Sequence, residues 1–239
     1  MYTDHFTAIQ SQRIGKIPHH HFLFDGVAGK LEALLAVPDT LPEAHEKSKD
    51  CGENPLNAIA VVCHPHPLHE GTMHNKVTYM IAKTLTDFGI PTLRFNFRGV
   101  EQSQGIHADG IGERDDLICA IEKMKQMFPN KNLWLGGFSF GAYISISVSQ
   151  HQSASQLISV APPVKTSYFE NINPPRCPWL VLQGLADEVV NAQDVIDWCT
   201  NLEMPPELIT YNDIGHYFHR RLPEIKTAIV NHIKLNHPQ

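Results

Sequence analysis

The sequence predicts a doubly wound α/β domain, in which helices cover both faces of a mostly parallel β-sheet. Short apolar runs bounded by glycine, proline or asparagine recur along the chain and are typical of buried strands. Segments with apolar residues at helical spacing lie between these runs, so that single strands alternate with single helices. A length of 239 residues suits one large domain or two small ones. Because the strands and helices alternate along the chain, we expect residues 1–239 to form one domain.

Seven apolar runs are predicted to be strands. In chain order they are GKLEALLAV (29–37), NAIAVVCHP (57–65), PTLRFNF (91–97), NLWLGGF (132–138), QLISVAP (156–162), PWLVLQG (178–184) and ELITYND (207–213). The polar stretch from Pro38 to Pro55 separates the first two runs and is expected to be an exposed loop.

Five helices are expected between the strands. Four of them follow from apolar stripes at helical spacing, which we interpret as core-facing surfaces. The stripes are Val77, Ile81, Leu85 and Phe88; Leu117, Ile121, Met124 and Phe128; Val195, Trp198 and Leu202; and Leu222, Ile225, Ile229 and Ile233. The fifth helix is the segment AYISISVS (142–149).

The composition describes a globular protein with little affinity for polyanions. Hydrophobic residues make up 42% of the chain and charged residues 18%, and the formal net charge is −6. This charge gives no electrostatic support to binding of nucleic acid or an anionic membrane. No apolar run approaches membrane length and no signal sequence is recognisable, so we expect a soluble, cytoplasmic protein. The five cysteines form no C-x-x-C pair and are expected to be free thiols.

The segment GFSFG places Ser139 between a predicted strand and a predicted helix. It fits the pattern G-x-S-x-G, in which a strained turn lifts a nucleophilic serine above the carboxyl ends of a sheet. The alternative is a glycine-rich strand end that is merely capped by a serine. Because serine is a weak nucleophile without a base, the catalytic interpretation also requires a histidine and an orienting acid.

Both groups occur at later strand ends, in the order that this arrangement requires. Asp187 follows the strand PWLVLQG, and His216 follows the strand ELITYND. Glu188, Asp194 and Asp213 are rival acids, but Asp187 lies just beyond its strand. We therefore predict Ser139, Asp187 and His216 as a catalytic triad.

The reaction would also need two backbone N–H groups that donate to an oxyanion. Phe140, the residue after the nucleophile, is expected to provide one. The loop after the strand NAIAVVCHP is expected to provide the other through His66 or Leu68, and we favour His66, because the neighbouring prolines have no N–H group. The competing interpretation of this loop is a metal site made of His64, His66, His69 and His74. A serine-centred mechanism uses no metal or cofactor, and we predict neither; His64 is instead expected to hold the loop through side-chain hydrogen bonds.

Nearly the whole chain resembles the α/β-hydrolase superfamily. The resemblance rests on the motifs HPHPLHEGTMHNKV, LRFNFRGVEQSQG, GFSFGA, ISVAPPV, QGLADEVV and GHYFHRRL. They are similar to a group of small bacterial esterase-like hydrolases that are related to dienelactone hydrolase and to Xaa-Pro peptidases. The resemblance implies the same triad. The segment FRGVEQSQG departs from the usual R-G-x-G-x-S-x-G, since Glu101 occupies a glycine position.

Many members of this superfamily carry a helical cap after the strand that corresponds to QLISVAP. Here only PVKTSYFENINPPRC separates that strand from the next, which is too short for a multi-helix lid. We therefore predict an open site without a sizeable cap domain. Tyr168, Phe169, Trp179 and Tyr217 are candidates for its walls.

The expected function is hydrolysis of carboxylic esters with a short or medium acyl group, through an acyl-enzyme. The partner would be a small-molecule ester. A thioesterase or a peptidase would use the same triad, and a binding protein without catalytic activity could share the fold. The oligomeric state and the physiological substrate are not predicted.

Overall fold

The computed structural model describes residues 10–14, 17–38, 56–165, 172 and 174–237. Nine strands of this part form one continuous sheet. Their order across the sheet is β1 (Gln10–Ile14), β2 (Ile17–Gly26), β3 (Gly29–Ala36), β5 (Thr92–Phe95), β4 (Ala58–Cys63), β6 (Asn132–Phe138), β7 (Gln156–Val160), β8 (Trp179–Gly184) and β9 (Glu207–Tyr211). The strands from β5 to β9 are parallel, whereas β1, β2 and β3 pair antiparallel with their neighbours.

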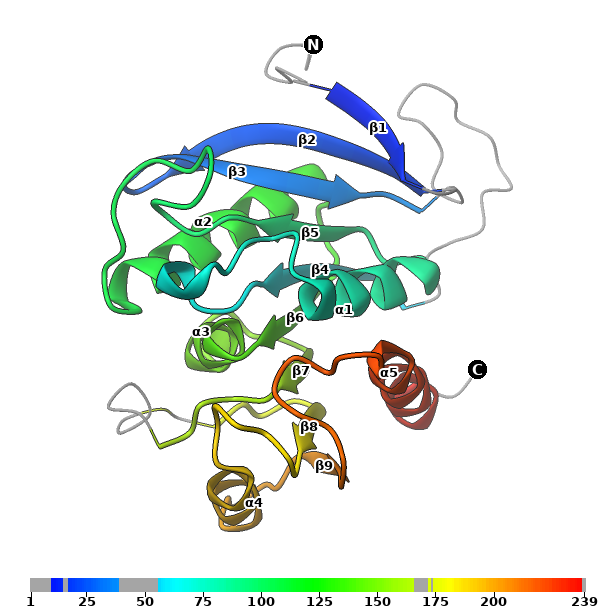
Figure 1. Ribbon diagram of the computed structural model, residues 1–239. Helices are drawn as coiled ribbons and strands as arrows, with labels where there is room; N and C mark the ends of the chain where they lie inside the picture. Colours follow the sequence, from blue (N-terminus) through cyan, green and yellow to red (C-terminus); the bar gives the residue numbers. More distant parts are fainter. Residues whose placement is uncertain (1–9, 15–16, 39–55, 166–171, 173, 238–239) are drawn as a thin grey trace.

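Helices cover both faces of the sheet (Figure 1). One face packs against α1 (Lys76–Asp87) and α5 (Leu222–Asn236). The other packs against α2 (Ile111–Met127), α3 (Phe140–Ser149) and α4 (Ala192–Thr200). The doubly wound, mostly parallel architecture predicted from the sequence is thus confirmed.

Two hydrophobic cores, one on each face of the sheet, follow from the alternation of side chains along the strands. In β4 every residue is buried, with Ile59 and Val61 in one core and Ala60 and Val62 in the other. A strand covered on both faces therefore reads as an unbroken apolar run, which is why the sequence pattern revealed it. Burial of each large apolar side chain stabilises the fold by roughly 1.5–3 kcal/mol.

The seven predicted strands and five predicted helices are all present, with ends that differ by a few residues. Two strands, β1 and β2, were not predicted. The run IPHHHFLFDG of β2 holds three consecutive histidines, His19 to His21, which break its apolar alternation. This segment is nevertheless a strand, because its backbone N–H and C=O groups form hydrogen bonds with β3.

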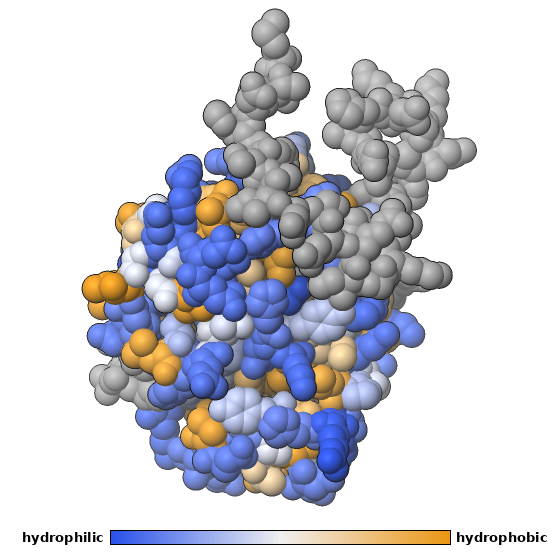
Figure 2. All heavy atoms as spheres, turned by 45° about the horizontal axis from the view of Figure 1, so that its top comes forward, coloured by the Kyte–Doolittle hydropathy of each residue, from blue (hydrophilic) through white to orange (hydrophobic). Residues whose placement is uncertain are grey.

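The surface around β1 to β3 is of the kind expected for a globular protein. Figure 2 shows hydrophobic residues scattered among hydrophilic ones on this face. No helix of the described residues has the length and apolarity that crossing a bilayer requires. The predicted loop from Pro38 to Pro55 lies between β3 and β4, and its residues 39–55, with Cys51, lie outside the described residues. Cys63, Cys119, Cys177 and Cys199 are free thiols.

Candidate active site

Ser139 occupies a strained turn between β6 and α3. Its backbone has φ 54° and ψ −120°, a conformation that residues other than glycine rarely adopt. A hydrogen bond of 2.8 Å from the Ser139 N–H to the carbonyl oxygen of Val160, at the end of β7, helps to hold the turn. The strain places the hydroxyl beyond the carboxyl end of the sheet, where later strand ends also lie.

Two glycines beside Ser139 allow β6, α3 and β4 to approach one another closely. A Cβ atom at Gly137 would lie 2.2 Å from the carbonyl oxygen of Gly141. One at Gly141 would lie 2.5 Å from the carbonyl oxygens of Cys63 and His64. Because these obstacles are backbone atoms that cannot rotate away, only glycine fits at either position.

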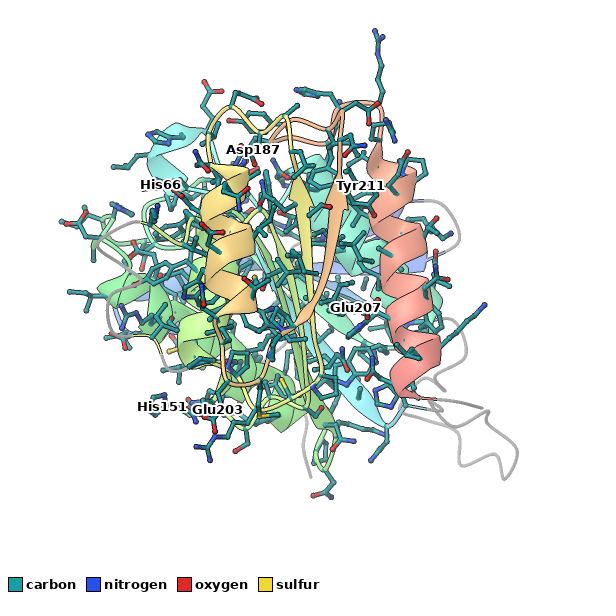
Figure 3. All side chains as sticks on the ribbon, turned by 90° about the horizontal axis from the view of Figure 1, so that it is seen from below. His66, His151, Asp187, Glu203, Glu207 and Tyr211 are labelled. Carbon is teal, nitrogen blue, oxygen red and sulfur yellow. The ribbon has the colours of Figure 1, made fainter. Side chains whose placement is uncertain are left out.

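The structure brings the three predicted catalytic residues together at one end of the sheet. His216 Nε2 lies 3.1 Å from Ser139 Oγ, and His216 Nδ1 lies 2.8 Å from Asp187 Oδ2. His216 is 2% exposed, and the Asp187 carboxylate is fully buried. Figure 3 shows Asp187 and His66 at the same end of the molecule, above the tips of the strands.

The Asp187 carboxylate is held ionised by its hydrogen bonds. Oδ1 accepts from the backbone N–H groups of Val189 and Val190 at 2.8 and 2.7 Å, and Oδ2 accepts from Gln183 Nε2 at 3.1 Å. Burial raises the pKa of Asp187, but the hydrogen bonds from His216 and the backbone outweigh burial and hold it below its usual value. An ionised carboxylate at this place fixes the His216 tautomer that carries a proton on Nδ1.

The rival acids have other partners. Glu188 accepts a hydrogen bond from the backbone N–H of His216 at 3.1 Å, but it does not bond the ring. Asp194 pairs with Lys165, and Asp213 pairs with Arg221, both at 2.6 Å. Among the four acids, only Asp187 bonds the imidazole in the described structure.

Two N–H groups of the loop after β4 were candidates for the oxyanion site. The Leu68 N–H donates to Nδ1 of His66 at 3.2 Å, so that it is already engaged in the loop's own turn. The His66 ring packs against the Phe140 ring with 4.8 Å between centroids, which places His66 beside the first residue of α3. The Leu68 N–H is thus engaged within the loop and the His66 ring lies beside Phe140, while the oxyanion role of these N–H groups stays a prediction.

Each histidine of the proposed metal cluster has a different environment. The His66 and His69 rings stack at 4.6 Å, and His74 Nε2 lies 3.7 Å from Glu101 Oε2. His64 is buried, and its ring donates to the carbonyl oxygen of Pro65 at 2.6 Å and accepts from the Phe97 N–H at 3.0 Å. Within the described ranges, no three His, Cys, Asp or Glu side chains are arranged to hold a metal ion.

Glu101 adopts a left-handed conformation, with φ 47°, at the position where a glycine is usual. Its carboxylate accepts a hydrogen bond from Asn96 Nδ2, which anchors the turn. The same segment is tied to α2 by an ion pair between Arg98 and Asp116, with 2.7 Å between Nη2 and Oδ1. Sequence reasoning missed this pair, because its members are far apart in the chain and no motif links them.

The structure places the four predicted wall residues differently. Tyr217 lies beside the catalytic histidine, since its ring packs edge-on against the His216 ring at 5.1 Å, and it lines a cavity of about 980 Å³. Tyr168 and Phe169 lie outside the described residues. Trp179 was a wrong prediction. It begins β8, at the strand end opposite Asp187, and its indole N–H donates to Ser159 Oγ inside the core.

The doubly wound sheet, the strained serine turn and the adjacent His–Asp pair together define an α/β serine hydrolase. The chain belongs to the α/β-hydrolase family whose model is described as serine aminopeptidase, S33, which matches residues 57–176. The fold and the superfamily indicated by the sequence motifs are thereby confirmed.

Two solved structures and two curated proteins illustrate the relationship. An α/β serine hydrolase homologue from Coxiella burnetii is 39% identical, covers 88% of this chain and 95% of its own, and superposes with a TM-score of 0.79. An α/β serine hydrolase without lid from Xanthomonas campestris is 38% identical over 92% of this chain and 96% of its own, with a TM-score of 0.82. An uncharacterized protein of Rickettsia prowazekii is 38% identical over 75% of this chain and 80% of its own. Esterase EstD of Thermotoga maritima is 22% identical, and the match covers 70% of this chain and 41% of EstD.

Proposed function

We propose that the chain is a serine carboxylesterase in which Ser139, His216 and Asp187 form the catalytic triad. The observation that carries this proposal is the continuous hydrogen-bonded path from Ser139 Oγ through the His216 ring to the buried Asp187 carboxylate. The strained Ser139 turn supports it, because backbone strain of this kind clusters at functional sites. We also propose that the chain works as a single hydrolase domain, which the continuous sheet supports.

In the acylation step, Ser139 Oγ attacks the ester carbonyl carbon while His216 Nε2 takes its proton. Asp187 stabilises the resulting imidazolium, and the backbone N–H groups of Phe140 and His66 donate to the oxyanion. The carbon–oxygen bond to the alcohol then breaks, and His216 returns the proton to the leaving oxygen. Water attacks the acyl-enzyme with the help of the same base, which releases the carboxylic acid and restores Ser139.

Thioester and peptide hydrolysis would use the same groups. The family model bears the name of an aminopeptidase, and an aminopeptidase has to bind the ammonium group of its substrate. The cavity beside Tyr217 is lined by basic side chains, and no described residue that lines it is acidic. In such a substrate the ammonium group lies on the acyl side of the bond that breaks, whereas this cavity lies beside His216, on the side of the leaving group. The relative turnover of esters and of peptides with a free amino terminus therefore distinguishes the two functions.

A fluorophosphonate probe tests the triad directly. We expect one covalent modification, mapped to Ser139 by mass spectrometry, because only an activated hydroxyl reacts readily. Ser147→Ala is the matched control on the same helix, since the Ser147 hydroxyl donates to the carbonyl oxygen of Ile144 at 2.8 Å, away from the His216 ring. This variant should retain labelling, whereas His216→Ala should lose it.

Turnover of p-nitrophenyl butyrate completes the test. Ser139→Ala and His216→Ala should each lower kcat by at least about a thousandfold, with the double variant hardly worse than either, because the residues act as a unit. Asp187→Asn should be far more damaging than Glu188→Gln. Labelling at another residue, or full activity of Ser139→Ala, would contradict the proposal.

A further inference from the structure

A basic cavity of about 980 Å³ lies between the N-terminal end of α1 and the loop that follows His216. Four of its lining residues carry basic side chains, and all four are exposed to solvent. They are His74, Lys76, His219 and Arg220. Two separate segments of the chain, on either side of the opening, thus place basic groups around one space.

The cavity is positively charged, whereas the whole chain has a formal net charge of −6. The nearby Arg221 and Lys226 are neutralised by Asp213 and Asp87, at 2.6 and 3.6 Å. Among the lining residues, His74 lies 3.7 Å from the Glu101 carboxylate and is not counted toward the free charge. Lys76 and Arg220, in contrast, form no ion pair with any described residue. The positive end of the α1 dipole adds to their potential. The cavity is therefore suited to an anion.

The position of the cavity relative to His216 indicates which part of a substrate would enter it. Tyr217 forms part of its wall, and the Tyr217 ring packs against the His216 ring at 5.1 Å. The leaving oxygen of an ester has to lie next to His216, from which it receives its proton. The alcohol part of the substrate is thus the part nearest the cavity. Among the apolar lining residues, Leu222 is partly exposed and can contact the carbon skeleton of the alcohol part, whereas Val77 and Phe218 are buried.

We propose that the natural substrate is an ester whose alcohol part carries a carboxylate or phosphate group, and that Lys76 and Arg220 bind this anion. The inference rests on the proposed esterase function and narrows it to a substrate class. The anion site does not involve the triad, so an experiment can contradict the anion site without contradicting the esterase function.

The test compares two butyrate esters that differ in the charge of the alcohol part, those of 4-hydroxybenzoate and of methyl 4-hydroxybenzoate. The quantity measured is the ratio of their kcat/KM values, which is compared between the wild type and the variant Lys76→Gln, Arg220→Gln. We expect the ratio of the anionic to the neutral ester to fall roughly tenfold in the variant, mainly through KM, since each exposed charge pair contributes modestly. Added salt should lower the wild-type ratio in the same direction.

Lys125→Gln, on α2 and away from the cavity, is the matched control and should leave the ratio unchanged. An unchanged ratio in the double variant, with the neutral ester still hydrolysed, would overturn the anion site alone. A charge effect confined to mono-p-nitrophenyl succinate, which carries its anion on the acyl side, would overturn the assignment to the alcohol part. Failure to hydrolyse p-nitrophenyl butyrate would instead contradict the esterase function itself.

Discussion

At the scale of single residues, the chain contains fifteen histidines, and their neighbours decide what each can do. His216 bonds both an acid and a serine, and it therefore has the partners of a catalytic base. His64 bonds two backbone groups and is wholly buried, and this burial lowers its pKa to about 3. It is neutral under ordinary conditions and joins the loop after β4 to the segment after β5, in keeping with its predicted role of holding the loop.

The buried His64 predicts a pH dependence of stability. Between its ordinary pKa of 6.5 and about 3, the unfolded chain binds a proton at His64 that the folded protein does not bind. The free energy of unfolding should therefore fall as the pH falls through this window, by at most about 1.4 kcal/mol per pH unit from this residue. In His64→Gln this part of the slope should be absent, which urea unfolding between about pH 7 and pH 5 can measure.

His151→Gln is the control for this prediction. His151 is exposed and lies at the opposite end of the sheet from the site (Figure 3). The slope of this variant should resemble that of the wild type. Equal slopes for His64→Gln and the wild type would show that His64 is not held neutral in the folded protein.

At the scale of elements, parallel strands explain how distant residues come together. Ser139, Asp187 and His216 follow β6, β8 and β9, and parallel strands end at one edge of a sheet. Sequence order was therefore enough to predict that the three would meet. The strand β2 was missed because its polar residues find partners in other strands, such as His21 Nε2 with Glu32 Oε1 at 2.7 Å. Such partners are invisible in a local pattern.

The close contact of α3 with β4 predicts the effect of adding one methyl group. Gly141→Ala should lower the free energy of unfolding by about 3 kcal/mol or more, because its Cβ would meet two backbone carbonyl oxygens at 2.5 Å. Gly136→Ala is the matched control, since its Cβ would lie 3.1 Å from the Ile81 side chain, which can shift. Urea unfolding measures both. A similar loss of unfolding free energy in both variants would show that the close contact between α3 and the backbone after β4 does not require glycine at position 141.

At the scale of the whole molecule, the described residues form no sizeable cap over the site. The connection between β7 and β8 is short and contains Pro162, Pro163, Pro174 and Pro175, which limit its conformations. The related Xanthomonas campestris hydrolase is likewise described as lacking a lid. An enzyme of this shape has little apolar surface with which to enclose a long acyl chain.

The open site predicts a preference for short acyl groups. Each methylene that the protein buries contributes about 0.8 kcal/mol, or roughly a fourfold gain in kcat/KM, until the chain outgrows the cleft. We expect kcat/KM for p-nitrophenyl esters to peak at a short acyl length, with no activation at a lipid–water interface. Measurement of the acyl series decides this, and a steady rise through palmitate would show a deep tunnel instead.

The sequence by itself determined the class of fold, the order of most strands and helices, and the three residues proposed as the triad. These features are local patterns or follow from strand order, because burial on both faces and the serine turn leave direct marks on the chain. Only the tertiary structure decided that the Leu68 N–H donates to the His66 ring, that Trp179 lies at the end of β8 away from Asp187, and that Lys76 and Arg220 share one cavity. The physical reason is that such facts depend on contacts between segments far apart in the chain, and no local pattern encodes them.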